Sequence, residues 1–256
     1  MIHLPTIISR CINTLRPVFL TIVMLFTFSD LVEQPLEAAK YNNRNKSLPA
    51  KIIILRHGED QNQDSDAILL ARGLERADAL AQAAPNWPAL RSQKPKAIFA
   101  TSLHTILTIK PTADKFALPL IVLSTSKKFS TWQQTQKELN AKKDKSAVYY
   151  PNKDATLIET HGRVKRLVEE LHKAQYAGTV VIVCWVHEEI PELVKSLGYT
   201  KVPHWPNAPL QKKGKVFDRF WVLDTTRDKK DKKGRYIFDS KENDLPERLL
   251  ASDSVK

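Results

Sequence analysis

The sequence is poor in cysteine and glycine, and both shortages narrow the class of protein. Only 2 of the 256 residues are cysteine, which excludes a small scaffold held together by disulfides. With 7 glycines and 42% hydrophobic residues, the composition is neither collagen-like nor that of a disordered chain. A chain near this length can bury one large core without covalent cross-links. We therefore expect one globular domain.

Acidic residues are also in short supply relative to basic ones. The chain has 40 Lys and Arg against 28 Asp and Glu, a formal net charge of +12. This excess favours an anionic partner, and charge alone leaves phosphates, nucleic acid and membranes open. The basic residues are clustered, and we expect the clusters on solvated faces, the last of them in a hairpin or loop: Lys127-Lys128, residues 142–145, residues 212–215 and residues 227–235.

Several motifs that would signal a cofactor or a nucleic acid are missing. There is no Walker loop, no GxGxxG fingerprint and no clustered Cys/His set with metal-ligand spacing, so we expect no cofactor and no metal. Zinc-finger and RNA-recognition motifs are absent, and the basic clusters lack the aromatic spacing of single-strand binders. Nucleic acid is therefore not an expected partner.

One long apolar run is present, near the N-terminus. Arg10 and Arg16 precede the run over residues 18–28, and the small pair Ala38-Ala39 follows a polar stretch. This order predicts a secretory signal peptide cleaved near Ala38, and export to a periplasmic or extracellular location. A run this short is about half of the roughly 20 residues that span a bilayer, so a retained anchor through residues 17–32 is the alternative.

We accordingly expect a signal peptide or anchor at residues 1–39, a linker at residues 40–50 and a folded domain at residues 51–256. Cleavage would change the formal charge to 38 − 25 = +13 and remove Cys11. Cys184 would remain as the single thiol, which suits a buried structural cysteine.

Beyond the linker, strand-like and helix-like segments alternate. Short apolar runs predict strands at residues 51–55, 97–101, 120–123 and 179–186, with further strand-like stretches at 219–223 and 235–238. Apolar residues at helical spacing predict helices at residues 69–84, 105–118, 155–175 and 190–197. Strands separated by such helices imply right-handed crossovers. We expect an α/β fold, a single three-layer α/β/α domain with a mostly parallel central sheet.

Two of the predicted strands end in histidine. Arg56-His57-Gly58-Glu59 follows the first, and His187-Glu188-Glu189 follows the strand at residues 179–186. In α/β sheets ligands collect outside the carboxyl ends of the strands, so both histidines can line one crevice if their strands are neighbours.

The residue types at these strand ends suit phosphoryl transfer. A neutral imidazole is a competent nucleophile toward phosphorus, and an adjacent arginine can hold a phosphoryl group by charge-assisted hydrogen bonds. A glycine lets the backbone turn and approach the ligand closely. A second, protonated histidine stabilises charge on the phosphoryl oxygens, and a carboxylic acid can protonate the leaving oxygen.

These motifs resemble the histidine phosphatase superfamily, which includes phosphoglycerate mutases and histidine acid phosphatases. The resemblance extends from Lys51 to about Thr225 and implies a phosphoglycerate mutase-like fold. Arg56-His57-Gly58 matches the family's RHG motif, which implies that His57 becomes phosphorylated and that Arg56 binds phosphate. Residues 70–77 resemble the family's first helix, and His187 matches its second catalytic histidine.

The same resemblance implies a proton donor close to these residues. Glu188 directly follows His187, as the acid of the His-Asp motif does in the acid phosphatase branch, and is the first choice; Glu59 is the second. Glu188 can equally belong to the acidic first turn of a helix. His161-Gly162 is a second His-Gly pair, which we expect at the surface because no strand is predicted before it.

The chain departs from the family pattern at one position. The segment after the second strand usually carries an arginine four residues before a threonine, as a second phosphate ligand. Here Thr108 is in place, but His104 replaces that arginine. Histidine offers fewer donors and is mostly neutral above pH 7. The replacement leaves three alternatives: reduced activity, activity shifted to acidic pH, or a catalytically inactive relative.

The sequence thus predicts an exported phosphomonoester hydrolase acting on a small phosphorylated substrate through a phosphohistidine at His57. Arg56, Gly58 and His104 would bind phosphate, while His187 and either Glu188 or Glu59 would complete the catalytic group. The alternative is a catalytically weak or inactive relative that binds an anionic ligand or partner. Loops at residues 60–66, 124–154 and 201–215 are expected to set specificity; the sequence does not predict the substrate or the oligomeric state.

Overall fold

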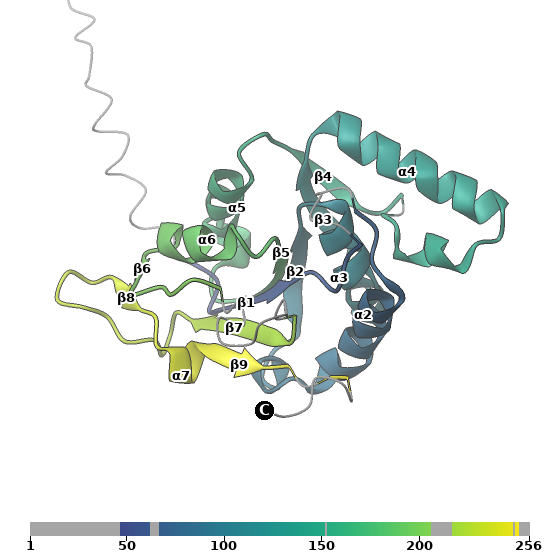
Figure 1. Cartoon of the computed structure of the whole chain (residues 1–256). Coiled ribbons are helices and arrows are strands. Elements are labelled where there is room, and N and C mark those ends of the chain that lie inside the picture. Colours follow the sequence, from purple (N-terminus) through teal and green to yellow (C-terminus); the bar gives the residue numbers. More distant parts are fainter. Residues whose placement is uncertain (1–46, 62–66, 152, 206–216, 248, 251–256) are drawn as a thin grey trace, which may run out of the picture. The chain divides into compact units, whose positions relative to one another are not determined.

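The alternating segments build a central sheet. The computed structural model describes residues 47–61, 67–151, 153–205, 217–247 and 249–250. Within these residues a seven-stranded sheet has the order β4-β3-β2-β5-β1-β7-β9 (Figure 1). Its strands are β1 (Lys51–Arg56), β2 (Pro95–Ala100), β3 (Leu120–Ser124), β4 (Thr156–Glu159), β5 (Val180–Trp185), β7 (Arg219–Asp224) and β9 (Asp244–Pro246).

The sheet is mostly parallel. β5 pairs in parallel with β1 and β2, and β3 pairs in parallel with β2 and β4, whereas β7 is antiparallel to β1 and β9. All six residues of β5 are buried, as expected of an apolar strand that is covered on both faces. Alternate residues of β1 point into two different cores, Ile53 and Leu55 into one and Ile52 and Ile54 into the other.

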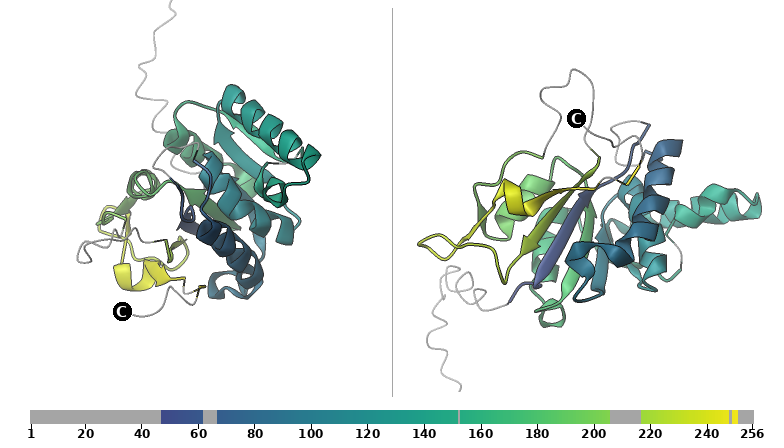
Figure 2. Two further views of the ribbon diagram at one scale, coloured as in Figure 1. Left: turned by 45° about the vertical axis from the view of Figure 1, so that its right-hand side comes forward. Right: turned by 90° about the horizontal axis from the view of Figure 1, so that it is seen from below.

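Two layers of helices cover the sheet (Figures 1 and 2). α2 (Ala71–Ala83), α3 (Leu103–Lys115) and α4 (Ser126–Ala141) supply the core that contains Ile53. α5 (Arg163–Leu171) and α6 (Ile190–Ser196) supply the core that contains Ile52. The expected three-layer α/β/α fold with a mostly parallel sheet is confirmed.

The remaining elements are short. β6 (Tyr199–Thr200) and β8 (Tyr236–Ile237) form a separate two-stranded sheet, and α7 (Ser240–Asn243) precedes β9. Single 3₁₀ turns complete the structure: η1 (Ala84–Asn86), η2 (Pro88–Leu90), η3 (Lys145–Tyr149) and η4 (Ala174–Tyr176).

Two expectations about individual elements were wrong. The helix expected over residues 155–175 starts only at Arg163, because Thr156–Glu159 form β4, which pairs with β3. The segment expected as a loop at residues 124–154 contains the 16-residue helix α4. Phe129 and Trp132 bury the inner side of α4, while most of its other residues are polar.

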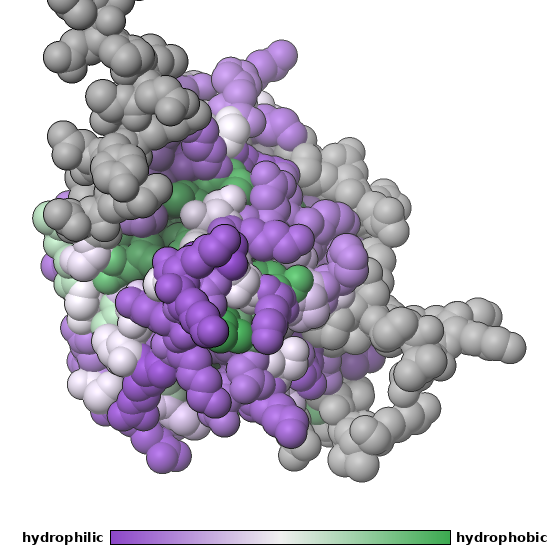
Figure 3. Space-filling view, turned by 90° about the vertical axis from the view of Figure 1, so that its left-hand side faces the viewer, coloured by the Kyte–Doolittle hydropathy of each residue, from purple (hydrophilic) through white to green (hydrophobic). Residues whose placement is uncertain are grey.

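The longest basic cluster behaves as expected of a solvated loop. Residues 227–235 connect β7 to β8, and their lysine and arginine side chains are exposed. Figure 3, which views the side that bears β6 and β8, shows a surface dominated by hydrophilic residues. Asp231 accepts hydrogen bonds from the backbone N–H groups of Lys233 and Arg235, which orders the turn.

The predictions for the N-terminal region fall outside the described residues. The signal peptide with cleavage near Ala38, the alternative anchor at residues 17–32 and most of the linker belong to residues 1–46, so they stay predictions. Among the residues that the structure does describe, no helix has the length and apolar character needed to span a bilayer.

Candidate active site

Parallel pairing of β1 with β5 brings His57 and His187 to the same edge of the sheet. Arg56 lies opposite Trp185 in this register, and the next residue, His57, donates its backbone N–H to the Trp185 carbonyl (3.3 Å). The ring centroids of His57 and His187 are 6.4 Å apart. The two histidines therefore share one site, at the carboxyl ends of the parallel strands.

His104 joins them from the first turn of α3. Ser102 caps this helix in a capping box with Thr105, which fixes where the helix begins. The His104 ring lies 4.0 Å from the His57 ring, centroid to centroid, and both side chains are buried. The structure thus gathers three imidazoles, including the one that replaces the arginine of the family pattern.

Thr108 holds the loop after β1 against α3. The Gly58 backbone N–H donates to Thr108 Oγ1 (2.8 Å), and the Thr108 hydroxyl donates to the His104 carbonyl (2.7 Å). This chain is buried, so its hydrogen bonds are shielded from water. The backbones that carry His57 and His104 are therefore fixed relative to each other.

His57 is held as a neutral imidazole. Burial, reinforced by the neighbouring His104 and the charge of Arg56, lowers its pKa to about 2. Nδ1 lies 2.8 Å from the Gly58 carbonyl, which can only accept, so Nδ1 carries the proton. The lone pair is left on Nε2, where a nucleophile would use it.

Arg56 is a buried cation beside His57. Burial lowers its pKa to about 10, while the charges of Glu188, Asp60 and Glu59 act in the opposite direction, so the guanidinium stays protonated at neutral pH. Its central carbon lies 4.2 Å from the centre of the Phe217 ring. A cation in this position can bind an anion next to the His57 imidazole.

The two candidate proton donors have different surroundings. Glu188 Oε2 lies 3.0 Å from His187 Nδ1, and the Glu188 side chain is 64% exposed, so this carboxyl can reach solvent and a ligand. Glu59 is instead bound by arginine: Arg76 Nε and Nη2 donate to its two oxygens (3.0 and 2.7 Å), and Arg72 Nε lies 3.1 Å from Oε1. Both oxygens of the Glu59 carboxylate therefore already accept hydrogen bonds from Arg76.

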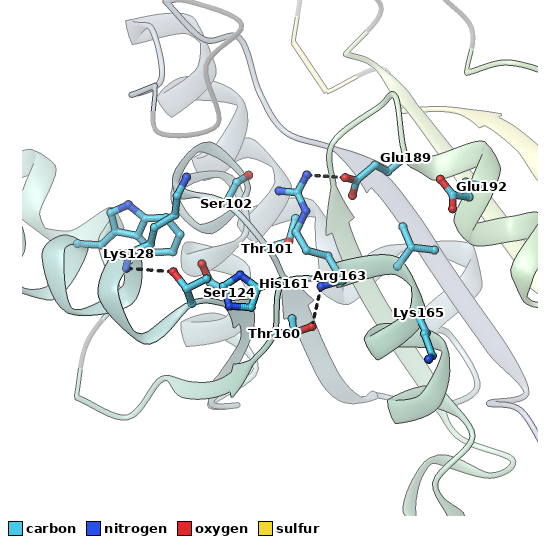
Figure 4. A pocket seen from close by; sticks show the side chains of 14 residues that line it. Thr101, Ser102, Ser124, Lys128, Thr160, His161, Arg163, Lys165, Glu189 and Glu192 are labelled. Carbon is cyan, nitrogen blue, oxygen red and sulfur yellow. Dashed lines mark hydrogen bonds and ion pairs between the residues drawn. The ribbon is translucent and has the colours of Figure 1, made fainter.

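A polar pocket of about 550 Å³ lies along the same edge of the sheet, at the ends of β2, β3 and β4 (Figure 4). Lys128, Arg163 and Lys165 line it, and Arg163 Nη2 pairs with Glu189 Oε1 (2.5 Å). His161 is exposed, as expected, but the expectation that no strand precedes it was wrong: β4 ends at Glu159, two residues earlier, and His161 lines the pocket.

Sequence reasoning missed two residues of the site. Asp60 Oδ2 lies 3.8 Å from His57 Nδ1, and the Asp60 side chain is 2% exposed. Phe217 packs edge-on against His57, with the ring centroids 5.9 Å apart. The spacing of Asp60, three residues after His57, was the available signal; Phe217 has none, since only the fold brings it to β1.

Comparison with known proteins yields a family match. The model of the histidine phosphatase superfamily (branch 1) matches residues 52–188, just over half of the 256 residues. No curated protein matches.

Solved structures of low sequence identity are also similar to the chain. A protein described as the phosphohistidine phosphatase SixA from Agrobacterium tumefaciens is 16% identical, with a TM-score of 0.39 over 71% of this chain and 94% of that one. A mycobacterial glucosyl-3-phosphoglycerate phosphatase is 15% identical, with a TM-score of 0.38 over 68% and 89%. The protein histidine phosphatase SixA complexed with tungstate is 12% identical, with a TM-score of 0.40 over 77% and 97%.

Proposed function

Since the chain belongs to the histidine phosphatase superfamily, we propose that it is a phosphomonoester hydrolase in which His57 forms a phosphohistidine intermediate. The observation that carries this proposal is the state of His57. Its imidazole is buried, neutral and hydrogen-bonded through Nδ1, and it lies next to the Arg56 cation and 6.4 Å from His187.

The first chemical step transfers the phosphoryl group to His57. Nε2 attacks phosphorus opposite the ester oxygen, so that an N–P bond forms while the P–O bond to the leaving group breaks. Arg56 and a protonated His187 stabilise the charge on the phosphoryl oxygens. In its protonated form, Glu188 gives a proton to the departing alkoxide; we prefer it to Glu59, whose oxygens are bound by Arg76.

The second step regenerates the enzyme. Glu188, now a carboxylate, takes a proton from water while the water oxygen attacks phosphorus. The N–P bond breaks, inorganic phosphate leaves, and both His57 and Glu188 return to their starting states. The same carboxyl thus acts first as an acid and then as a base.

The polar pocket is our candidate for the site of the leaving group. Its lining residues Thr101 and Ser102 come just before His104, and Glu189 directly follows Glu188, so the pocket adjoins the histidines. Its lining carries three basic side chains, Lys128, Arg163 and Lys165, against the two carboxylates of Glu189 and Glu192, so a small excess of positive charge remains. We therefore expect a small substrate that carries an anionic group in addition to the phosphate being transferred.

Hydrolysis of an aryl phosphate between pH 4 and pH 8 tests the proposal. The full chain should turn the substrate over, His57→Ala should fall to background, and His204→Ala, which alters an exposed histidine outside the site, should match the wild type. Acid-labile phosphate trapped on the wild type and missing from His57→Ala would identify the nucleophile.

The test also addresses the replacement at position 104. His104→Arg restores a charge-assisted bond to phosphate worth about 1.5–3 kcal/mol, so phosphate should bind about ten-fold tighter or more.

Equal turnover by the wild type and His57→Ala would refute the hydrolase. Phosphate binding with no turnover by the wild type would instead favour the alternative, a non-catalytic protein that binds an anion.

A further inference from the structure

Three side chains at the site form a group with the composition of a metal centre. His57, Asp60 and His104 each offer one ligand atom, and these atoms all lie within 4.8 Å of one another. Two imidazoles and a carboxylate are a common donor set for Zn²⁺ and related transition-metal ions, and three protein ligands leave a position open.

The spacing is close to what a metal ion requires. Ligand bonds of about 2.0–2.1 Å place the donor atoms of a tetrahedral zinc site roughly 3.3 Å apart. The separations here are at most 4.8 Å, about 1.5 Å longer than that value, so binding requires the three side chains to move toward a common ion. The hydrogen bonds of Thr108 fix the loop of His57 against α3, so the backbones that carry His57 and His104 are already held near each other.

The hydrogen bonds around His57 also suit a metal ligand. In metal sites the second nitrogen of a ligating imidazole commonly donates to a carbonyl or carboxylate, which fixes the tautomer and orients the ring. Nδ1 of His57 makes such a bond to Gly58. With the proton on Nδ1, the lone pair of Nε2 is the one left to bind a metal ion.

The replacement of arginine by His104 favours cation binding in two ways: it removes a positive charge and it adds a ligand atom. An arginine, which the family pattern places there, would bring a positive charge and no lone pair, whereas His104 brings a lone pair and no fixed charge. Arg56 and a protonated His187 oppose a cation at this site, and the carboxylates of Glu188, Asp60 and Glu59 act on the Arg56 guanidinium. The site therefore retains acidic groups that offset this repulsion.

We propose that His57, His104 and Asp60 bind a divalent transition-metal ion of the Zn²⁺ type, and that the bound ion blocks the nucleophile. Binding follows from the donor group alone; the inhibition rests on the proposed function. A Zn²⁺ ion on His57 occupies the lone pair that attacks phosphorus, so metal binding and phosphoryl transfer exclude each other.

Direct titration of the metal-free full chain with Zn²⁺, in competition with a chromophoric chelator, tests binding without reference to activity. One ion should bind per chain, and His104→Arg and Asp60→Asn should each weaken binding at least ten-fold. His204→Ala, which removes an exposed histidine, is the matched control and should bind as the wild type does. Far-UV circular dichroism shows whether each variant is folded.

Cobalt supplies a second measurement. Co²⁺ added to the wild type should give the visible absorption of a four-coordinate site, and His104→Arg should not. Failure of the wild type to bind Zn²⁺, or unchanged Zn²⁺ affinity in both His104→Arg and Asp60→Asn, overturns the site.

Activity assays separate the two proposals. Zn²⁺ should inhibit aryl phosphate turnover by the wild type, a chelator should restore it, and any activity of His104→Arg should be at least ten-fold less sensitive. Zn²⁺ binding by a metal-free protein that has no turnover would support the site and count against the hydrolase. Turnover unaffected by saturating Zn²⁺ would overturn the inhibition.

Discussion

The buried imidazole of His57 couples the stability of the fold to pH. In the unfolded chain this side chain titrates near pKa 6.5, whereas in the folded protein its pKa is about 2. Between these values the unfolded state holds one more proton, so the free energy of unfolding falls as pH drops below 6.5. A difference of one bound proton changes the free energy of unfolding by about 1.36 kcal/mol per pH unit. Between pH 7.5 and pH 5 the free energy of unfolding therefore falls by about 2 kcal/mol.

Urea unfolding of the wild type and His57→Gln at pH 7.5 and pH 5 measures this loss. The glutamine does not titrate, so the free energy of unfolding of the wild type should fall by about 2 kcal/mol more than that of the variant. The other histidines are common to both chains and cancel in the comparison. An equal pH dependence in the two chains would mean that folding does not lower the pKa of His57.

For single residues, the sequence predicted which side chains lie in the site better than it predicted which partners they contact. Arg56, His57, His104 and His187 were all expected at one site, and the structure brings them together because β5 is the neighbour of β1. That Glu59 is paired with Arg76 could not be predicted, because the partner comes from the next helix and from packing that no local pattern records.

Close packing of α2 against the loop of His57 depends on a glycine. A Cβ atom built on Gly73 would lie 2.3 Å from the Glu59 carbonyl oxygen, so Gly73→Ala must displace the loop or the helix. We expect a loss of about 1–3 kcal/mol in the free energy of unfolding, typical of overpacking. Turnover should fall as well, because the displaced loop carries His57.

Gly162→Ala is the matched control, since a Cβ atom at Gly162 meets nothing within 4 Å. Its free energy of unfolding should stay within about 0.5 kcal/mol of the wild type. Thermal and urea unfolding of both variants check the prediction. If Gly73→Ala proved as stable as Gly162→Ala, the loop would have room that the structure does not show.

The elements themselves show where a local pattern fails. The central strands were predicted because they are continuous apolar runs, and β1 and β5 were found within a residue or so of the expected ends. β4 was mistaken for the start of a helix because Leu157 belongs to the apolar stripe that continues along α5. Pairing with β3, more than thirty residues earlier in the chain, makes it a strand instead.

On the scale of the whole molecule, Arg76 links the site to the C-terminal part of the chain. Its Nε and Nη2 atoms bind Glu59, and Nη1 donates to Glu247 Oε2 (2.7 Å), a residue that follows β9. The Arg76 and Glu247 side chains are 2% and 1% exposed. The antiparallel strands β7 and β9 therefore help to support the loop that follows β1 and carries His57, although residues 52–188 alone carry the family match.

Removal of one member of this buried pair should destabilise the whole domain. Glu247→Ala leaves part of a buried guanidinium uncompensated, at a cost of about 3–5 kcal/mol in the free energy of unfolding. The matched control is Glu169→Ala, because Glu169 pairs with Arg166 at the surface, where both side chains are more than a third exposed and such pairs contribute about 0–1 kcal/mol. Urea unfolding measures both changes, and equal losses in the two variants would show that Glu247 does not anchor Arg76.

Since Arg76 also positions Glu59, which directly follows the His57-Gly58 pair, Glu247→Ala should lower turnover of any chain that remains folded, whereas Glu169→Ala should not.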